Sequence, residues 1–370
     1  MIDLVCLGKA FDLQKEIVAK ITGIEDSRVV NCKSLNGDLV FLQSDTSINP
    51  DLANQKVVVG QKFLDQLYLG DVLLLKPNGF VRILFRVKSN HNSLFVTEMC
   101  NSNCLMCSQP PKNADDIDYH YTINEQLINL IPKSTKFLGI TGGEPLLLES
   151  KFVKLLDDCQ NLLPETHIHV LTNGRYFAWP KFVELFNGID KERIVFGIPL
   201  YSDFDENHDF IVQAKNAFNQ TILGLHNLGR NEFRIEIRCV LHKLTFERLP
   251  RLAEYIYSNL PFVEHIAFMG LEYTGYTPYN SKLLWIEPHA YSTELEQSVL
   301  FLNSVGINVS IYNIPLCLLT PSTRKFARNS ISDWKKEYLE ECIGCSHLND
   351  CGGVFGTSKI QSAYIKAIID

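Results

Sequence analysis

The first 90 residues alternate short apolar runs with turn signals. Strand-like runs occur in VVNCKSL, GDLVFLQ and KVVVG. In residues 70–87, two further apolar runs flank Pro77-Asn78-Gly79, a sequence that predicts a hairpin turn. This pattern predicts a small β-rich domain over residues 1–90, and nothing in it indicates chemistry.

From residue 93 onward, strand-like runs are separated by helical stretches. The strands are expected at 93–98, 136–141, 167–172, 193–200, 233–240, 265–270 and 307–313. The helices are expected at 149–160, 206–228, 246–259 and 287–305. Strands joined through helices imply crossover connections and a parallel sheet. The expected fold class is α/β, a complete or partial barrel with its chemistry beyond the C-terminal ends of the strands.

One predicted strand is apolar on one face and charged on the other. Arg234, Glu236 and Arg238 alternate with Ile235, Ile237 and Cys239. A strand in a fully packed barrel would be apolar on both faces. The charged face therefore favours an open, polar lumen that holds a ligand, and the alternative is an edge strand with one solvated face.

Composition and charge limit the cellular compartments and the classes of partner that we expect. The chain has 370 residues and a net charge of −7, so its overall charge gives no reason to bind nucleic acid or anionic lipid. The first 16 residues lack the apolar run of a signal peptide, and no apolar stretch is long enough to cross a membrane. We therefore expect a cytoplasmic protein with no membrane partner.

The reducing cytoplasm argues against a disulfide framework for the eleven cysteines. Cys6, Cys32, Cys159 and Cys239 are scattered among apolar residues, and we expect them to be inert thiols in the protein interior. The other seven form two groups.

The first group is Cys100, Cys104 and Cys107, in a C-x3-C-x2-C array directly after the first strand of the α/β region. Three thiolates in one loop can converge on one metal centre, and three rather than four leave an iron of a cubane cluster open. A closed zinc site would need a fourth ligand, but none is evident in the loop; His91 and His120 lie outside it.

A glycine-rich segment follows the second strand of this region. Thr141 precedes Gly142, Gly143, Glu144 and Pro145. Two glycines allow a backbone to approach a ligand closely, and Glu144 offers a carboxylate to an ammonium group. Such a segment alone is usually just a turn, but after a C-x3-C-x2-C loop it is a strong signal.

This combination resembles the radical SAM superfamily. The resemblance implies that Cys100, Cys104 and Cys107 bind a [4Fe–4S] cluster whose open iron is chelated by S-adenosylmethionine (SAM). It implies that residues 142–145 line the methionine end of SAM and receive its ammonium. The family usually has an aromatic residue just before the third cysteine; here Met106 stands there. The implied fold is a partial (β/α)6-type radical SAM barrel over residues 91–313, after the β-rich domain.

The resemblance extends to other strand ends. It implies SAM contacts by side chains that follow the third to sixth strands, each of which has an ordinary turn or packing role as its alternative. The residues concerned are Thr172 and Asn173, Ser202 beside Tyr201, Arg238 as a partner of the SAM carboxylate, and Met269 beside the adenine.

The implied chemistry is reductive cleavage of SAM to a 5′-deoxyadenosyl radical, which abstracts a hydrogen atom from a substrate. An external low-potential electron donor, such as a ferredoxin or flavodoxin, is expected because the cluster must work at the low end of its potential range. The cofactor supplies the difficult step and the protein supplies positioning. No substrate-specific catalytic residue can be assigned from the sequence.

The second cysteine group lies in residues 314–370. Cys342, Cys345 and Cys351 have ligand-like spacing, and Cys317 supplies a fourth thiolate; His347 is an alternative ligand. Four thiolates bind either structural zinc or an iron–sulfur cluster. The pattern is similar to the SPASM and twitch extensions of radical SAM peptide maturases, although no cysteine follows Cys351. We expect a C-terminal metal-binding extension with at most one auxiliary [4Fe–4S] cluster, or zinc.

Several segments, including LFVTEMCNSNCLMCSQPPK, FLGITGGEPLL, VLTNGR and RCVLHK, resemble the HxsC-type maturases of the His-Xaa-Ser peptide system. That resemblance implies modification of a ribosomally made peptide alongside a partner radical SAM maturase. One alternative is a radical SAM enzyme acting on a small molecule or RNA, with RNA disfavoured by the acidic charge balance. An alternative of another class is a non-catalytic zinc or iron–sulfur scaffold.

Overall fold

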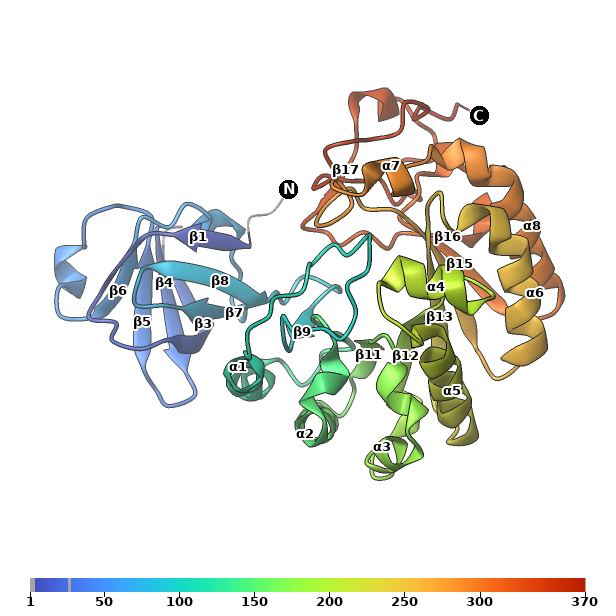
Figure 1. Cartoon of the computed structure of the whole chain (residues 1–370). Coiled ribbons are helices and arrows are strands. Elements are labelled where there is room, and N and C mark those ends of the chain that lie inside the picture. Colours follow the sequence, from blue (N-terminus) through green and yellow to red (C-terminus); the bar gives the residue numbers. More distant parts are fainter. Residues whose placement is uncertain (1–3, 26–27, 370) are drawn as a thin grey trace.

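The computed structural model describes residues 4–25 and 28–369. Residues 1–3, on which the signal-peptide expectation partly rests, lie outside the described residues. The chain forms two eight-stranded sheets and a two-stranded ribbon. In Figure 1 the first sheet is a lobe of its own, and the second sheet is wrapped by helices.

The N-terminal sheet confirms the β-rich prediction. Its order is β1-β8-β7-β3-β4-β5-β6-β2. The predicted hairpin is present, with Gly79 at a φ of 86° in the turn between β7 and β8. The strands are β1 (Val5–Leu7), β2 (Lys9–Phe11), β3 (Ile17–Glu25), β4 (Val29–Ser34), β5 (Leu39–Gln43), β6 (Lys56–Val59), β7 (Val72–Leu75) and β8 (Phe80–Phe85).

This sheet is buried on both faces where it meets the second lobe. Side chains of a strand point alternately to its two faces. On β7, Leu73 and Leu75 belong to the core of the N-terminal lobe. Val72 and Leu74 belong to the core of the other lobe, with Ile123 and Leu127 of α1 (Ile117–Leu130). One continuous apolar contact therefore joins the lobes.

The second sheet is parallel throughout and open, in the order β16-β15-β14-β13-β12-β11-β10-β9. It confirms the α/β prediction in its partial form, because β9 at one end and β16 at the other are not paired with each other. The strands are β9 (Ser93–Phe95), β10 (Phe137–Thr141), β11 (His167–Leu171), β12 (Ile194–Pro199), β13 (Arg234–Leu241), β14 (His265–Gly270), β15 (Asn308–Tyr312) and β16 (Ala327–Arg328).

Helices follow most strands and cover the outer face of this sheet (Figure 1). Helix α1 lies between β9 and β10, in keeping with the alternation of strands and helices that the sequence predicted. The helix expected at 206–228 is in fact two, because Gln213 and Asn216 between them adopt left-handed φ values of 53° and 57°. The remaining helices are α2 (Ser150–Leu162), α3 (Pro180–Glu184), α4 (Asp205–Val212), α5 (Ala217–Arg230), α6 (Leu249–Asn259), α7 (Ser281–Leu284) and α8 (Ser292–Ser304).

The inner face of the sheet is polar, as the alternation on β13 predicted. Glu236 is 5% exposed, and its carboxylate is 2.5 Å from Arg238 Nη1 and 2.7 Å from His265 Nδ1. Burial opposes ionisation of Glu236, but contacts with His169 and His265 and the charge of Arg238 outweigh it, so the pKa of Glu236 is lowered. Arg234 differs from the expectation: its side chain pairs with Glu264, 3.0 Å away, at the N-terminal end of the strand.

The C-terminal segment is mostly irregular chain. It adds β16 to the barrel sheet and forms the ribbon of β17 (Lys336–Glu337) and β18 (Val354–Phe355). It also touches the linker between the lobes, where Asp333 is 2.7 Å from Arg86 Nη1. Among the described residues, no helix is long and apolar enough to cross a bilayer.

Candidate functional site: two cysteine centres

The three-cysteine loop begins directly after β9 and rests on the glycine-rich end of the neighbouring strand β10. Gly143 N donates to the Thr97 carbonyl at 2.7 Å, and Glu144 N donates to the Met99 carbonyl at 2.7 Å. A Cβ on Gly143 would lie 2.0 Å from the Met99 carbonyl oxygen. Glycine is therefore required here, because any side chain would push the loop off the strand end.

Glu144 ties the ends of β10 and β11 together. Its carboxylate accepts from Thr172 Oγ1 at 2.6 Å, Asn173 N at 2.7 Å and Leu146 N at 2.9 Å, and the residue is 1% exposed. Burial raises the pKa of Glu144, and these hydrogen bonds oppose that rise. Predicted site residues Thr172 and Asn173 are thus held by the same carboxylate as the glycine-rich segment, and buried Pro145 continues that turn.

The segment after β11 also forms hydrogen bonds with the cysteine loop. Asn173 Nδ2 donates to Asn101 Oδ1 at 2.5 Å. Arg175 Nη1 donates to the Asn101 carbonyl at 2.5 Å and to Ser102 Oγ at 3.1 Å. The role of Arg175 was not foreseen, although it directly follows Thr172-Asn173-Gly174 in the chain.

The far side of the loop is fixed by two other segments. Asn103 N and Leu105 N donate to carbonyls at the end of α4, each at 3.0 Å. Tyr276 N donates to the Cys107 carbonyl at 2.9 Å, and Gly275 beside it has a φ of 59°. A Cβ on Gly275 would lie 2.2 Å from that carbonyl oxygen. The end of α4 and residues 275–276, which are far apart in the sequence, thus hold the same short loop.

The three thiols are close enough to act on one another. Burial raises the pKa of Cys100 to about 12, with a further increase from the charge of Glu144. Burial also raises the pKa of Cys104, and the charges of Cys107 and Cys100 add to it. Neutral thiols are favoured until a metal supplies positive charge, since metal binding drives deprotonation of its ligands.

The donor set fits a cluster better than a single ion. Among the described residues, no three His, Cys, Asp or Glu side chains are arranged to hold one metal ion. Four sulfur ligands on one tetrahedral zinc would lie about 3.8 Å apart. In a cubane each thiolate binds a different iron, so the sulfurs are spread more widely. Cys100, Cys104 and Cys107 supply three thiols from one fixed loop, a donor set that would leave one iron of a cubane for another ligand.

Three other predicted site residues lie at or near neighbouring strand ends, and within the described residues none of them forms a hydrogen bond or ion pair with the cysteine loop. Ser202 is fully buried, 3.5 Å from the Asp203 carboxylate. Met269 is half-buried on β14, in register with Tyr312. Arg238 is held by Glu236 and lies 5.9 Å from the centre of the Tyr312 ring.

A buried aromatic group beside the loop was not foreseen. Tyr201 is 8% exposed, its ring stacks on His208, and the centroid of the tilted His242 ring lies 6.4 Å from that of Tyr201. Burial raises the pKa of Tyr201, and the charges of Cys104 and other thiols act in the same direction. Burial lowers the pKa of both histidines to about 3, so they are neutral here.

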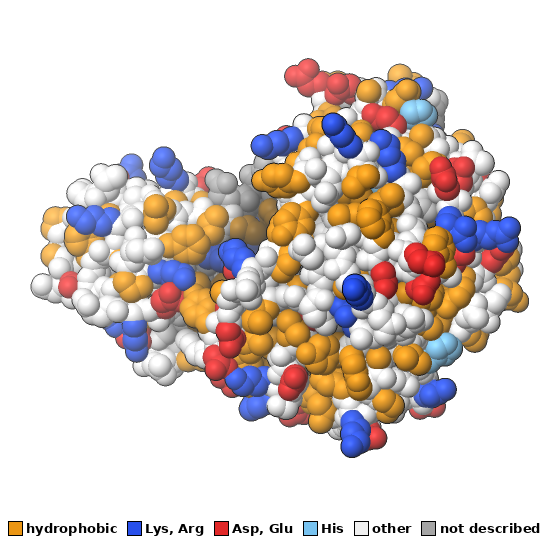
Figure 2. Space-filling view, viewed as in Figure 1, with side chains coloured by type: hydrophobic (Ala, Val, Ile, Leu, Met, Phe, Trp, Pro, Cys, Tyr) orange, Lys and Arg blue, Asp and Glu red, His pale blue; other side chains and the backbone are white. Residues whose placement is uncertain are grey.

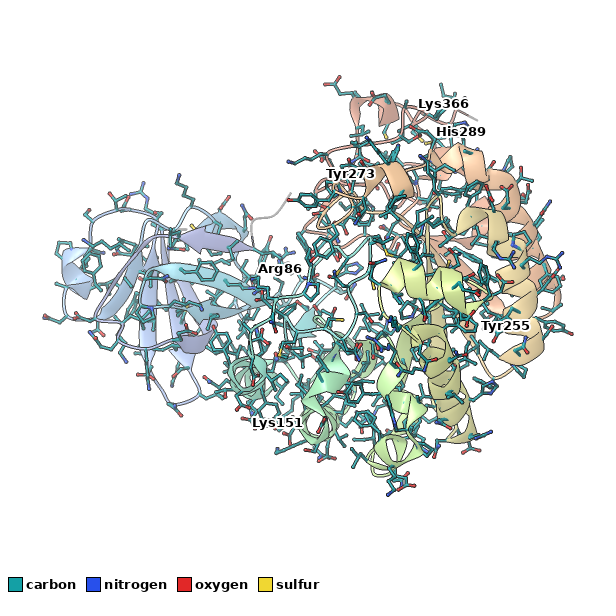
Figure 3. All side chains as sticks on the ribbon, viewed as in Figure 1. Arg86, Lys151, Tyr255, Tyr273, His289 and Lys366 are labelled. Carbon is teal, nitrogen blue, oxygen red and sulfur yellow. The ribbon has the colours of Figure 1, made fainter. Side chains whose placement is uncertain are left out.

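The four C-terminal cysteines converge on a second place. Cys317, Cys342, Cys345 and Cys351 line one small cavity, closed by apolar side chains and by Lys366. Lys366 lies beside His289 over this segment (Figure 3). Backbone N–H groups already point at two of the sulfurs: Leu316 N and Gly353 N lie 3.4 and 3.5 Å from Cys351 Sγ, and Ile368 N lies 3.4 Å from Cys345 Sγ.

The scattered cysteines mostly behave as expected. Cys32, Cys159 and Cys239 are fully buried, and burial raises the pKa of each thiol to about 12. Cys6 is only half-buried, on the edge strand β1.

Comparisons with known proteins agree with this geometry. The family model described as the Radical SAM superfamily matches residues 94–256. A Methanocaldococcus jannaschii protein named as a glycyl-radical enzyme activating enzyme is 38% identical over 96 residues, which are 23% of this chain and 24% of that protein. An uncharacterised protein of the same organism is 30% identical over 186 residues, 48% of this chain and 61% of that one. The chain thus spans about a quarter of the length of the first relative and about three fifths of the length of the second.

The solved structure of anSMEcpe with bound AdoMet has the same fold. It aligns with a TM-score of 0.50 and 14% identity, over 74% of this chain and 88% of that chain. The matched family segment begins at β9, contains the three cysteines and the glycine-rich strand end, and runs into α6. Residues 94–256, which form the first part of the barrel, therefore match the radical SAM family model and carry both the cysteine loop and the glycine-rich strand end.

Proposed function

We propose that the protein is a radical SAM enzyme that cleaves SAM and modifies a ribosomally made peptide. The observation that carries the proposal is the placement of Cys100, Cys104 and Cys107 in one loop that rests on Gly143 at the end of β10. This is the arrangement that a cluster with one open iron needs.

Different residues of the chain would bind the cluster, position the backbone and bind SAM. Cys100, Cys104 and Cys107 would hold the cluster, which when bound supplies the electron that breaks a carbon–sulfur bond of SAM. Glu144 already has three hydrogen bonds from the protein, so its first task is to position the glycine-rich backbone and the Thr172–Asn173 turn against the ligand. Arg238, which Glu236 holds on the lumen face, would pair with the SAM carboxylate.

The four C-terminal cysteines would hold an auxiliary [4Fe–4S] cluster rather than zinc. The support is chemical: four thiols line one apolar cavity, and N–H groups point at Cys345 and Cys351. Hydrogen bonds to the sulfurs are one of the means by which a protein tunes a cluster potential. Within the part of the chain that the structure describes, no group of three or more His, Cys, Asp or Glu side chains is arranged to hold a single ion, which supports a cluster over zinc.

A peptide substrate, a partner radical SAM maturase and a low-potential electron donor follow from the resemblance to HxsC-type maturases. A second candidate is activation of a glycyl-radical enzyme, favoured by the 38% identity over 96 residues to a protein so named. A glycyl radical detected by electron paramagnetic resonance on a folded partner enzyme would select the second candidate. A mass change on a short peptide would select the first.

The test has two stages. The protein is reconstituted anaerobically with iron and sulfide, and both are counted per chain; two clusters correspond to about eight irons. Dithionite and SAM are then added, and 5′-deoxyadenosine is measured. Formation of 5′-deoxyadenosine supports the proposal. Zinc without iron or acid-labile sulfide, and no SAM cleavage, would identify a metal-binding scaffold instead.

A further inference from the structure

A cleft of about 590 Å³ lies where the N-terminal sheet meets the barrel. Figure 2 shows the molecule hollowed between the two lobes. The cleft is walled by β8, by the segment that joins β8 to β9, by β9 itself and by α1, with Trp334 of the C-terminal segment at its rim. Its volume is in the usual range for ligand-binding pockets.

One end of the cleft adjoins the three-cysteine loop. Its lining includes Glu98, just before the loop, Gln109, just after it, and Thr141, which precedes Gly142. Cys107 Sγ lies 3.0 Å from the Gln109 carbonyl. A molecule bound along the cleft would therefore end beside the place where SAM is expected.

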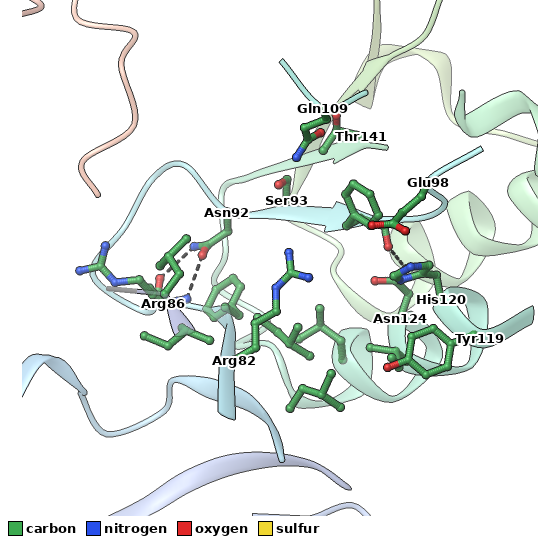
Figure 4. A pocket seen from close by; sticks show the side chains of 18 of the residues that line it. Arg82, Arg86, Asn92, Ser93, Glu98, Gln109, Tyr119, His120, Asn124 and Thr141 are labelled. Carbon is green, nitrogen blue, oxygen red and sulfur yellow. Dashed lines mark hydrogen bonds between the residues drawn. The ribbon is translucent and has the colours of Figure 1, made fainter. Parts of the chain in front are cut away.

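The cations that line the cleft differ in whether an acidic group pairs with them among the described residues. Lys76 is paired with Glu16 at 3.0 Å, Arg86 with Asp333 at 2.7 Å, and Lys112 with Glu98 at 2.7 Å. Within the residues that the structure describes, the Arg82 side chain forms no ion pair or hydrogen bond. Its guanidinium lies 6.0 Å from the centre of the Phe95 ring and projects into the cleft (Figure 4). Such a group is suited to bind a carboxylate in a bidentate manner.

The wall of the cleft also includes an open sheet edge. Strand β9 is the last strand of the barrel sheet, and the N-terminal lobe pairs only with itself. Ser93 and Phe95 of β9 both line the cleft. The Phe95 carbonyl already accepts a hydrogen bond from Asn124 Nδ2 at 2.8 Å, so a further extended strand would pair with the remaining main-chain groups of this short edge.

We propose that this cleft binds an extended segment of the substrate peptide, with an acidic side chain of that segment on Arg82. The peptide runs along β9 toward the three-cysteine loop. The apolar contact of Val72 and Leu74 with α1 holds the two walls together, so the cleft is formed before the peptide arrives. This inference rests on the proposed peptide-modifying function and specifies the peptide it selects.

The test uses the full-length reconstituted protein and a hexapeptide library in which one position is fixed as Asp, Asn or Lys and the others are random. Bound peptides are quantified by mass spectrometry. The wild type is expected to enrich Asp pools over Asn pools about tenfold, the effect of one charge-assisted interaction. Arg82→Glu should reverse the preference toward Lys pools, and Arg82→Gln should abolish it.

Arg251→Glu is the matched control, because Arg251 is an exposed arginine on α6 that is not part of the cleft lining. It should keep the preference for Asp. An unchanged preference in Arg82→Glu, or equal changes in both variants, would overturn the inference. SAM cleavage should differ by less than about twofold between these variants, since Arg82 contacts none of the proposed SAM or cluster residues. Binding of the library does not require catalytic turnover. An absence of 5′-deoxyadenosine would therefore reject the proposed function, and the binding result could still be interpreted.

Discussion

The two cysteine centres differ in how they are held. The three-cysteine loop is gripped by backbone and side-chain hydrogen bonds from the ends of β10, β11 and α4 and from residues 275–276. The four C-terminal cysteines lie on irregular chain around an apolar cavity. The first group offers three thiols at the ends of parallel strands, and under the proposed function it would leave one iron open, which suits catalysis. The second group offers four thiols, which would close a bound metal centre, and this suits stability or electron transfer.

The largest effect should come from Cys104, the most buried of the three loop thiols. Cys104→Ala should abolish SAM cleavage and remove about four irons per chain, because two thiolates do not hold a cubane. Iron content and 5′-deoxyadenosine measure this. Cys239→Ala, a buried cysteine on β13, is the matched control and should keep both. Full activity in Cys104→Ala would refute the assignment of the first centre.

Gly143 tests whether the first centre depends on the backbone of β10. Gly143→Ala places a Cβ 2.0 Å from the Met99 carbonyl oxygen, so the loop must shift. A displacement of about 1 Å can cost about a hundredfold in rate, and we expect a loss of SAM cleavage of that order. Gly188→Ala is the control, since a Cβ there meets nothing within 4 Å. Equal behaviour of the two variants would contradict the proposed contact.

Cys345 tests whether the second centre is separable from the first. Cys345→Ala should lower the iron content to that of one cluster and the thermal midpoint of unfolding, while some SAM cleavage remains without peptide modification. Iron analysis, a thermal melt and the 5′-deoxyadenosine assay measure the three. Complete loss of cleavage together with loss of folded protein would mean that the second centre holds the barrel together.

The smallest effect should come from Arg175, which supports the first loop without being a ligand. Arg175→Met removes the hydrogen bonds to Asn101 and Ser102, at a cost of about 1.5 kcal/mol. The loop should take up iron about tenfold more weakly, and the second centre should be unaffected. Iron uptake by Arg175→Met in a Cys345→Ala background isolates the first centre. Unchanged uptake there would show that backbone contacts suffice to hold the loop.

The sequence by itself determined much of the barrel and the identity of both cysteine groups. Period-two alternation placed the strands, and it placed Glu236 and Arg238 on a polar inner face because successive side chains of a strand point to opposite sides. Ligand spacing separated Cys100, Cys104 and Cys107 from the cysteines that are only buried. Strand alternation and cysteine spacing are local properties, so they can be read from one short segment of the chain.

Only the tertiary structure decided which distant segments meet. The split of the expected 206–228 helix depends on left-handed residues that no periodicity marks. The grip of Arg175 on Asn101 joins residues 74 positions apart. The cleft that holds Arg82 exists only because the N-terminal sheet packs on α1, a contact that the hydrophobic pattern did not reveal. Contacts across large sequence separations come from packing of whole elements, which hydrophobic pattern and spacing do not specify.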